Sequence, residues 1–144
     1  VEKNLNQNLE NDFDIILIDA PAGIGSGFKL AAAMADEAII VSLPDSVCVR
    51  SCEIASSELL SMGIEKQRLV INRFDKKAVK SSKLLNLDSV IDSCCVQLVG
   101  VVPEDKELMF NFSAGKDLKR KSDTKKAFLR IAKRLSGDDV KIKI

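Results

Sequence analysis

Short apolar runs recur along this chain, and a segment with helical character separates each run from the next. Runs that are apolar on both faces are typical of strands buried in a parallel sheet. Because parallel strands joined through helices need right-handed crossovers, the alternation predicts an α/β fold, a parallel sheet flanked by helices. The four predicted strands are residues 14–19, 38–44, 68–74 and 97–103.

The final predicted helix has the clearest pattern. Phe128, Ile131 and Leu135 recur at the spacing of one buried helix face, whereas the outer face is rich in lysine and arginine and is interpreted as solvated. Ser122 or Asp123 can cap its start. The predicted helices are residues 27–35, residues 46–62 closed by Gly63, residues 88–93, and the final helix closed by Gly137.

The composition limits the function. A length of 144 residues is that of about one domain, and a hydrophobic content of 46% suffices for a packed core. The 22 basic and 21 acidic residues nearly cancel, so no whole-chain field favours non-specific binding to nucleic acid. The chain has no histidine, which excludes Ser-His-Asp and Cys-His nucleophiles and all histidine-ligated metal sites.

The four cysteines are Cys48, Cys52, Cys94 and Cys95. No loop-rich disulfide pattern surrounds them, and no apolar run approaches the length of about 18 residues expected of a membrane span. Reduced thiols are therefore expected. A site of four thiolates is conceivable, but the spacing differs from C-x-x-C knuckles, and small buried thiols are the favoured interpretation.

Asp19 follows the first apolar run directly. It is predicted to lie at the carboxyl end of a buried strand, where open α/β sheets bind their ligands. Pro21 and Gly23 come next and turn the chain. An aspartate that only caps this turn is the alternative interpretation.

Several stretches resemble the second half of the MinD-type ATPases, a group within the ParA/MinD family of P-loop NTPases. They are DAPAGIGSGFK, ADEAIIVSLPDSVCVRSCE, LVINRF and LVGVVPEDKEL, and the resemblance extends in order over residues 12–137. It implies a Rossmann-like, three-layer P-loop fold. It also implies a role in binding and hydrolysing MgATP to control the placement of the cell-division septum.

The resemblance assigns roles to the first loop. Asp19 matches the Walker B aspartate, which holds Mg²⁺ through a water, and a hard cation that keeps several waters suits a single carboxylate. Gly23 matches the switch II glycine, whose backbone N–H is implied to sense the γ-phosphate. Only a residue without Cβ lets the backbone approach a ligand that closely.

The resemblance also implies an adenine pocket. Asn72 matches the asparagine that reads the adenine edge, because a carboxamide offers one acceptor and two donors. Pro103, Glu104 and Asp105 match the other wall of the pocket. An ordinary strand end and an ordinary turn are the alternatives.

Arg50 and Glu53 match a face used in ATP-dependent homodimerisation. Ser51 and Cys52 depart from the family pattern there, and a solvated helix face is weighed equally. The resemblance further implies regulator partners of the MinC and MinE kinds and a cytoplasmic location, peripheral to the membrane. Family members bind the membrane through a C-terminal amphipathic helix, for which residues 138–144 are too short.

No phosphate-binding loop of the type G-x-x-x-x-G-K-[ST] occurs in the sequence. Residues 1–144 are therefore interpreted as one domain, the carboxyl-terminal portion of the ATPase and inactive alone, with a loop expected about 100 residues before Asp19. In this family the strand preceding that loop lies between the Walker B strand and the next one. The sheet is accordingly expected to lack its central strand.

Other relatives on the same scaffold remain open. ParA-type partition proteins, iron–sulfur carriers of the Mrp type and flagellar-number ATPases share the fold, and Pro21 is the residue that favours the MinD type over the flagellar group. A different class is also open, namely a non-catalytic interaction module that has lost its phosphate-binding loop.

Overall fold

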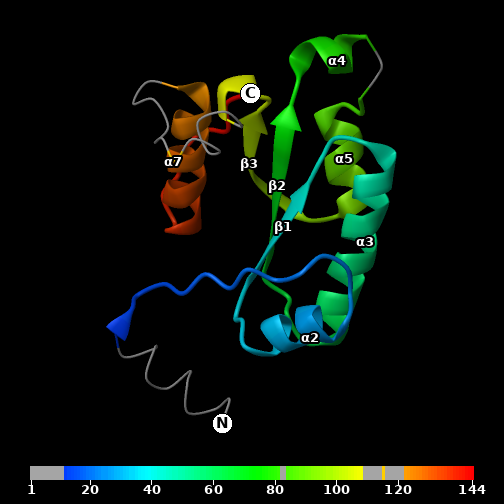
Figure 1. Ribbon diagram of the computed structural model, residues 1–144, viewed down its shortest axis with the longest axis vertical. Coiled ribbons are helices and arrows are strands. Elements are labelled where there is room, and N and C mark those ends of the chain that lie inside the picture. The colour runs from blue at the N-terminus through cyan, green and yellow to red at the C-terminus, as the bar shows by residue number, and fades with distance from the viewer. Residues whose placement is uncertain (1–11, 82–83, 109–114, 116–121) are drawn as a thin grey trace.

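The structure is a computed structural model that describes residues 12–81, 84–108, 115 and 122–144. Helices and strands alternate through most of the described chain (Figure 1). In order they are α2 (Ser26–Ala33), β1 (Ala38–Ser42), α3 (Ser46–Ser61), β2 (Gln67–Phe74), α4 (Lys76–Lys80), α5 (Leu87–Cys94), β3 (Gln97–Pro103) and α7 (Asp123–Leu135).

The three strands form one sheet in the order β1-β2-β3, and both pairs are parallel. Ile40 pairs with Leu69 across β1 and β2, and Leu69 pairs with Leu98 across β2 and β3. Each crossover passes through helices, as the alternation of the sequence requires. The predicted parallel α/β fold is therefore confirmed.

Helices cover both faces of this sheet. On one face, α3 and α5 pack over a core that includes Leu69, Ile71 and Val90, all completely buried. On the other face, α7 packs through Ala127 and Ile131 against the strands (Figure 1). Alternate residues of the central strand β2 thus feed two different cores, which explains why its sequence is apolar on both faces.

The contact between α7 and the sheet depends on a glycine in β3. A Cβ added to Gly100 would lie 2.2 Å from Cγ1 of Ile131, so only a residue without a side chain permits this approach. Gly100 therefore sets how closely α7 packs on β3.

The helix boundaries follow the capping residues of the sequence. Asp45 caps α3 by accepting hydrogen bonds from the N–H groups of Val47 and Cys48, and Gly63 ends the helix region with φ of +87°. Ser122 caps α7, one of the two residues predicted to do so. The predictions of α2, α3, α5 and α7 are confirmed, whereas α4, in a charged stretch, was not predicted.

The prediction of a buried strand at residues 14–19 is wrong. The segment is extended, but it pairs with no strand among the described residues, and it runs crosswise to the arrows of the sheet in Figure 1. Ile15 is 70% exposed and Leu17 is 82% exposed. A run that is apolar on both faces needs neighbours on both sides, and the described chain provides none.

The predicted buried face of α7 is also corrected. Phe128 and Leu135 are exposed, and the buried residues are Thr124, Ala127 and Ile131. The observed stripe has the predicted spacing but lies one helical turn earlier. Ala127 and Ile131 are the α7 side chains that join the buried cluster with the sheet, and Phe128 and Leu135 project away from that cluster.

The sheet and the helices named above include neither end of the chain. Residues 138–144 form no strand despite their alternating sequence, and the carbonyl of Val140 accepts a hydrogen bond from Arg134 at 2.6 Å. Residues 1–11, which resemble the end of the helix that precedes the Walker B strand in the family, lie outside the described residues. No helix in the described ranges has the length and apolar character needed to cross a bilayer.

Candidate functional site

The carboxyl ends of β2 and β3 bring together two of the predicted site segments. Phe74 and Pro103 are paired across the strands, and the backbone N–H of Glu104 donates to the carbonyl of Phe74 at 3.1 Å. The register between the strands is irregular from Ile71 to Phe74. Asn72 and the loop after Pro103 therefore lie side by side at one edge of the sheet, as expected for neighbouring parallel strands.

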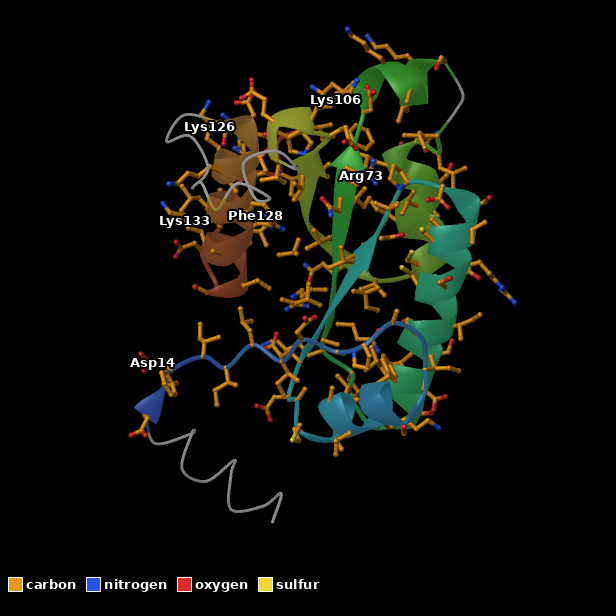
Figure 2. All side chains as sticks on the ribbon, in the orientation of Figure 1. Asp14, Arg73, Lys106, Lys126, Phe128 and Lys133 are labelled. Carbon is orange, nitrogen blue, oxygen red and sulfur yellow. The ribbon has the colours of Figure 1, made fainter. Side chains whose placement is uncertain are left out.

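Arg73 is a residue of this edge that the sequence reasoning missed. Its φ is +53°, a left-handed conformation that is uncommon outside glycine. Its backbone N–H donates to Oδ1 of Asn72 at 2.9 Å, and its side-chain Nε donates to Oε2 of Glu104 at 2.8 Å. Figure 2 shows Arg73 near the carboxyl end of β2. The only sequence signal was a basic residue directly after a strand-end asparagine.

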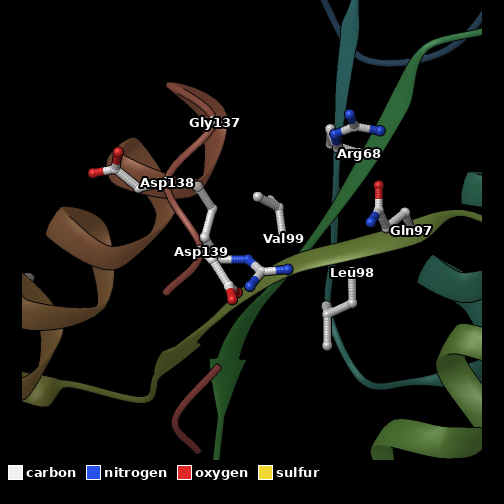
Figure 3. Close-up of a pocket in the computed structure, with 8 residues that line it drawn as sticks. Arg68, Gln97, Leu98, Val99, Gly137, Asp138 and Asp139 are labelled. Atoms are coloured by element: carbon white, nitrogen blue, oxygen red, sulfur yellow. The ribbon is translucent and has the colours of Figure 1, made fainter. Parts of the chain in front are cut away.

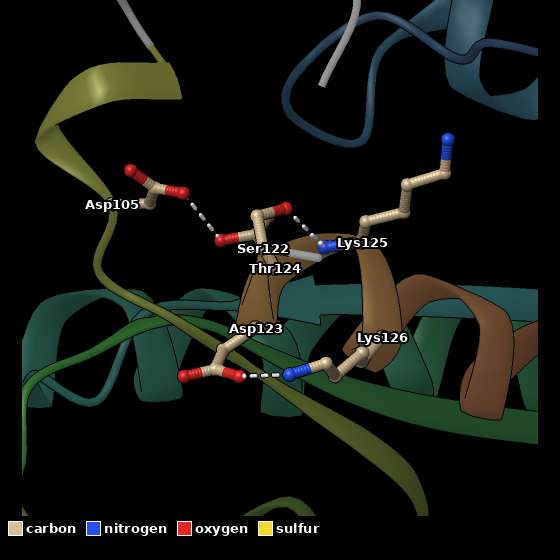
Figure 4. Close-up of polar contacts among 6 residues, drawn as sticks. All are labelled: Asp105, Ser122, Asp123, Thr124, Lys125 and Lys126. Carbon is tan, nitrogen blue, oxygen red and sulfur yellow. Dashed lines mark hydrogen bonds and ion pairs between the residues drawn. The ribbon is translucent and has the colours of Figure 1, made fainter. Parts of the chain in front are cut away.

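Asp105 holds the loop after β3 in place. Its Oδ1 accepts from the backbone N–H groups of Glu107 and Leu108, and its Oδ2 accepts from the hydroxyl of Thr124 at 2.8 Å (Figure 4). Thr124 is 1% exposed. Both carboxylate oxygens are thus engaged, so Asp105 fixes the loop to the start of α7 rather than offering a free acceptor.

Asp19 and Gly23 lie on the unpaired segment rather than at this edge. No hydrogen bond or ion pair joins either of them to another residue in the ranges that the structure describes. Asp14, at the start of the segment, lies far from Arg73 in Figure 2. Gly23 has φ of +85°, so the turn itself requires a glycine there. The assignments of Asp19 to Mg²⁺ and of Gly23 to the γ-phosphate stay predictions.

Arg50 and Glu53 lie on the outer face of α3. Nη1 of Arg50 and Oε2 of Glu53 are 2.7 Å apart, and the arginine side chain is largely exposed. An exposed ion pair of this kind adds little stability. The pair is therefore compatible both with a solvated face and with a contact surface.

The cysteines do not form the conceivable metal site. The described residues, which include all four thiols, contain no group of three or more histidine, cysteine or acidic side chains placed to hold a metal ion. Burial raises the pKa of the Cys94 thiol to about 11, with a smaller contribution from Cys52 beside it. A hydrogen bond to Asp45 raises the pKa of Cys48. Cys52 and Cys94 behave as small buried core residues.

The polar groups of Asn72 and Asp19 suit the parts of MgATP. Because Oδ1 of Asn72 is held by the backbone, its amide NH₂ is left to donate to an acceptor on a base. The carboxylate of Asp19 is exposed and suits a hydrated Mg²⁺. The residues present therefore fit an adenine base and a magnesium ion in their chemistry.

A separate pocket of about 270 Å³ lies at the opposite end of the strands. Figure 3 shows the residues that line it. Arg68 and Gln97, near the amino ends of β2 and β3, form one side, and Arg134 and Asp139 form another. Ligands of parallel sheets bind at the carboxyl ends. We therefore place the candidate site at Asn72 and Glu104 and not in this pocket.

The chain resembles known proteins along nearly its whole length, although it matches no family model. It is 34% identical over 141 residues to the septum site-determining protein MinD of Synechocystis, an alignment that covers 96% of this chain and 53% of the relative. It is 32% identical over 145 residues to MinD of Bacillus subtilis, an alignment that covers 99% of this chain and 54% of the relative. The chain thus spans about half the length of the curated relatives it matches.

Solved structures agree with these relatives. The MinD cell division protein of Aquifex aeolicus superposes with a TM-score of 0.90 at 29% identity, over 96% of this chain and 60% of that one. The Aquifex MinC:MinD complex superposes with a TM-score of 0.90 at 28% identity, over 99% of this chain and 62% of that one. MinD of Pyrococcus horikoshii, complexed with Mg-ADP, superposes with a TM-score of 0.80 at 25% identity, over 92% of this chain and 54% of that one.

A parallel sheet with helices on both faces, and with polar residues gathered at its carboxyl edge, places the molecule in the class of P-loop NTPase folds. The sequence identities to the MinD relatives, over nearly all of this chain, identify the family within that class. The chain belongs to the MinD family, and it corresponds to the carboxyl-terminal half of those proteins.

Proposed function

We propose that this chain forms the base-binding half of a MinD-like ATPase that controls septum placement. The observation that carries the proposal is the carboxyl edge of the sheet, where Phe74 pairs with Pro103 and Arg73 is bonded to both Asn72 and Glu104. The complex of the Pyrococcus relative with Mg-ADP supports a nucleotide ligand.

Each residue has a distinct task in this proposal. Asn72 donates from its amide to the base, while Pro103 and Glu104 form the opposite wall, held in place by Asp105. Asp19 holds the hydrated magnesium ion, and Gly23 lets the backbone approach the γ-phosphate. Asp19 would hold this ion, which would supply positive charge to offset the negative charge of the phosphates.

The uncovered apolar surface supports the view that hydrolysis needs further polypeptide. Within the described residues, positions 14–19 pair with no strand, and β1 has no neighbour along one edge of the sheet. Ile39 and Val41 project from this edge strand and are exposed. A strand inserted beside β1 would satisfy its backbone groups and cover apolar surface. We propose that the half of the relatives not represented here supplies that strand and the phosphate-binding loop.

The partners of the chain are part of the same proposal. The Aquifex MinC:MinD complex supports binding to a MinC-like regulator. We place the ATP-dependent homodimer contact at Arg50 and Glu53, which are accessible on α3. A MinE-like regulator, and a cytoplasmic location with peripheral attachment to the membrane, follow from the resemblance to the family.

A titration of the ¹⁵N-labelled chain with MgATP, followed by NMR, tests the proposed site. We expect chemical-shift changes at the backbone amides of Arg73, Glu104 and Asp105 and at the side-chain amide of Asn72. Substituting Asn72→Ala should abolish most of these changes, whereas Arg68→Lys, at the other end of β2, should not. Shift changes confined to the pocket near Arg68 would place the ligand elsewhere.

A second candidate function is that of a non-catalytic interaction module. The exposed apolar side chains of residues 13–18 and of β1 favour it, because large exposed apolar patches mark interaction surfaces. The same titration separates the two functions. A module without a nucleotide site would show no shift change at Asn72 with MgATP at any concentration.

A further inference from the structure

The pocket at the amino ends of the strands is lined by charged groups of both signs. Arg68 belongs to β2 and Gln97 to β3, while Arg134 lies in the last turn of α7 and Asp139 follows that helix. The volume of about 270 Å³ suits a small molecule, because pockets for larger ligands are usually more spacious. The pocket lies at the end of the strands opposite the candidate nucleotide site, so its ligand is a separate molecule.

Arg134 places a buried donor without an acceptor in this region. Its Nη1 donates to the carbonyl of Val140 at 2.6 Å, which holds the guanidinium in place. Its Nε is buried and has no hydrogen-bond partner among the described residues. Native proteins pair nearly all such groups, because a buried N–H without an acceptor is costly. The edge of the guanidinium that carries Nε therefore calls for an acceptor, and such an edge fits the paired oxygens of a carboxylate or a phosphate.

The acidic residues of the pocket do not neutralise its arginines. Asp138 and Asp139 line it together with Arg68 and Arg134, yet no ion pair joins any of the four to another residue in the part of the chain that the structure describes. Figure 3 shows the carboxylate of Asp138 turned away from Arg68 and Gln97. Two positive and two negative side chains give no net charge, so a simple anion gains little from the combined field. A ligand that carries both charges gains from both.

We propose that this pocket binds a small zwitterion, in which a short chain joins an acidic group to an ammonium group, as in an amino acid or a phosphorylated amine. Arg68 and Arg134 hold the acidic group, and the side-chain amide of Gln97 donates to it. The carboxylate of Asp139 accepts from the ammonium group. The carboxyl end of α7 carries partial negative charge and favours the ammonium group on the same side.

An NMR titration of the ¹⁵N-labelled chain with glycine and with phosphoethanolamine tests the proposal and distinguishes the two acidic groups. We expect saturable shift changes at Nε–H of Arg134, at the side-chain amide of Gln97 and at the backbone N–H of Asp139. Ligands with so few atoms should bind with dissociation constants on the order of 1–10 mM. Acetate and methylammonium carry one charge each and should bind at least about threefold more weakly. Acetate binding as tight as that of glycine, or no saturable change with either zwitterion, would refute the proposal.

Substitutions test the two halves of the site separately. Asp139→Asn removes the partner of the ammonium group and should weaken glycine binding by about three- to fivefold, as for an exposed ion pair, without changing acetate binding. Arg68→Gln should weaken the binding of both. Asp123→Asn makes the same change at the other end of α7, where the side chain is exposed, and as the matched control should bind glycine as the native chain does.

The melting temperature of each variant shows whether the fold is retained. If Asp139→Asn alters glycine and acetate binding equally, its charge acts only at long range and the assigned contact is wrong. The titration with MgATP reports on the other end of the strands, so a failure of the zwitterion site leaves the proposed nucleotide site standing.

Discussion

At the scale of single residues, the candidate site is organised by side chains that hold the backbone. Asp105 engages both carboxylate oxygens and thereby joins the loop after β3 to α7. The amide oxygen of Asn72 accepts a hydrogen bond from the backbone N–H of Arg73. Several polar groups at this edge are therefore engaged in hydrogen bonds within the protein. The side-chain NH₂ of Asn72 remains to donate to a ligand.

Removing the hydroxyl of Thr124 should destabilise the fold. Thr124→Val keeps the shape of the side chain but deletes its hydrogen bond to Asp105, which we expect to lower the free energy of unfolding by about 1 kcal/mol. Urea denaturation monitored by circular dichroism measures this change. Ser51→Ala, which deletes an exposed hydroxyl bond within α3, is the control and should cost nothing measurable. Equal losses in both variants would show that Thr124 has no special role.

The thiols should differ in reactivity. Cys95 is exposed, whereas Cys52 and Cys94 are buried, and burial raises the pKa of Cys94 to about 11. Because the thiolate is the reactive species, we expect Cys95 to be alkylated first and Cys94 only when the chain unfolds. Mass spectrometry of peptides after limited treatment with iodoacetamide reports the order. Early labelling of Cys94 would contradict the packing of α5 against α3.

At the scale of elements, the close fit of α7 on β3 is the most sensitive contact. Gly100→Ala places a methyl group against Ile131, and such overpacking should lower the free energy of unfolding by about 1–3 kcal/mol. Gly25→Ala has open space around the new Cβ and serves as the control, with an expected cost of only about a few tenths of a kcal/mol.

A double-mutant cycle identifies the cause of this loss. In an Ile131→Ala background the atoms that clash are gone, so Gly100→Ala should cost less than it does in the native chain. Thermal or urea unfolding of the four variants measures the coupling. Equal costs in both backgrounds would mean that α7 does not press on Gly100.

Secondary-structure elements differ in how well the sequence alone predicts them. The bounds of β3 agree with the prediction at both ends, because a continuous apolar run and a terminal proline specify them. The strand at residues 14–19 failed because pairing is a tertiary property, and no described segment offers it a partner. Arg73 was missed for a related reason, since a positive φ within a strand leaves no mark in the pattern of residue types.

At the scale of the whole molecule, the chain leaves an unusual amount of apolar surface uncovered. Leu17 is exposed on the unpaired segment, Val41 on the edge strand and Phe128 on α7. Exposed edges and patches of this kind promote association. The chain spans about half of its relatives, and this surface is where we propose that the other half packs.

We therefore expect the isolated chain to self-associate and lysine substitutions on this surface to reduce the association. Leu17→Lys and Val41→Lys should shift the chain towards the monomer in size-exclusion chromatography with light scattering, without lowering its melting temperature. Leu60→Lys, on the outer face of α3, is the control and should leave the association unchanged. A native chain that is monomeric at high concentration would contradict the expectation.

The most direct test of the nucleotide site is a crystal structure of the chain grown with MgATP. The account predicts that the adenine lies between the amide of Asn72 and the loop at Pro103 and Glu104. A base bound instead in the pocket of Arg68 and Arg134, or no nucleotide at the carboxyl edge of β2 and β3, would contradict it.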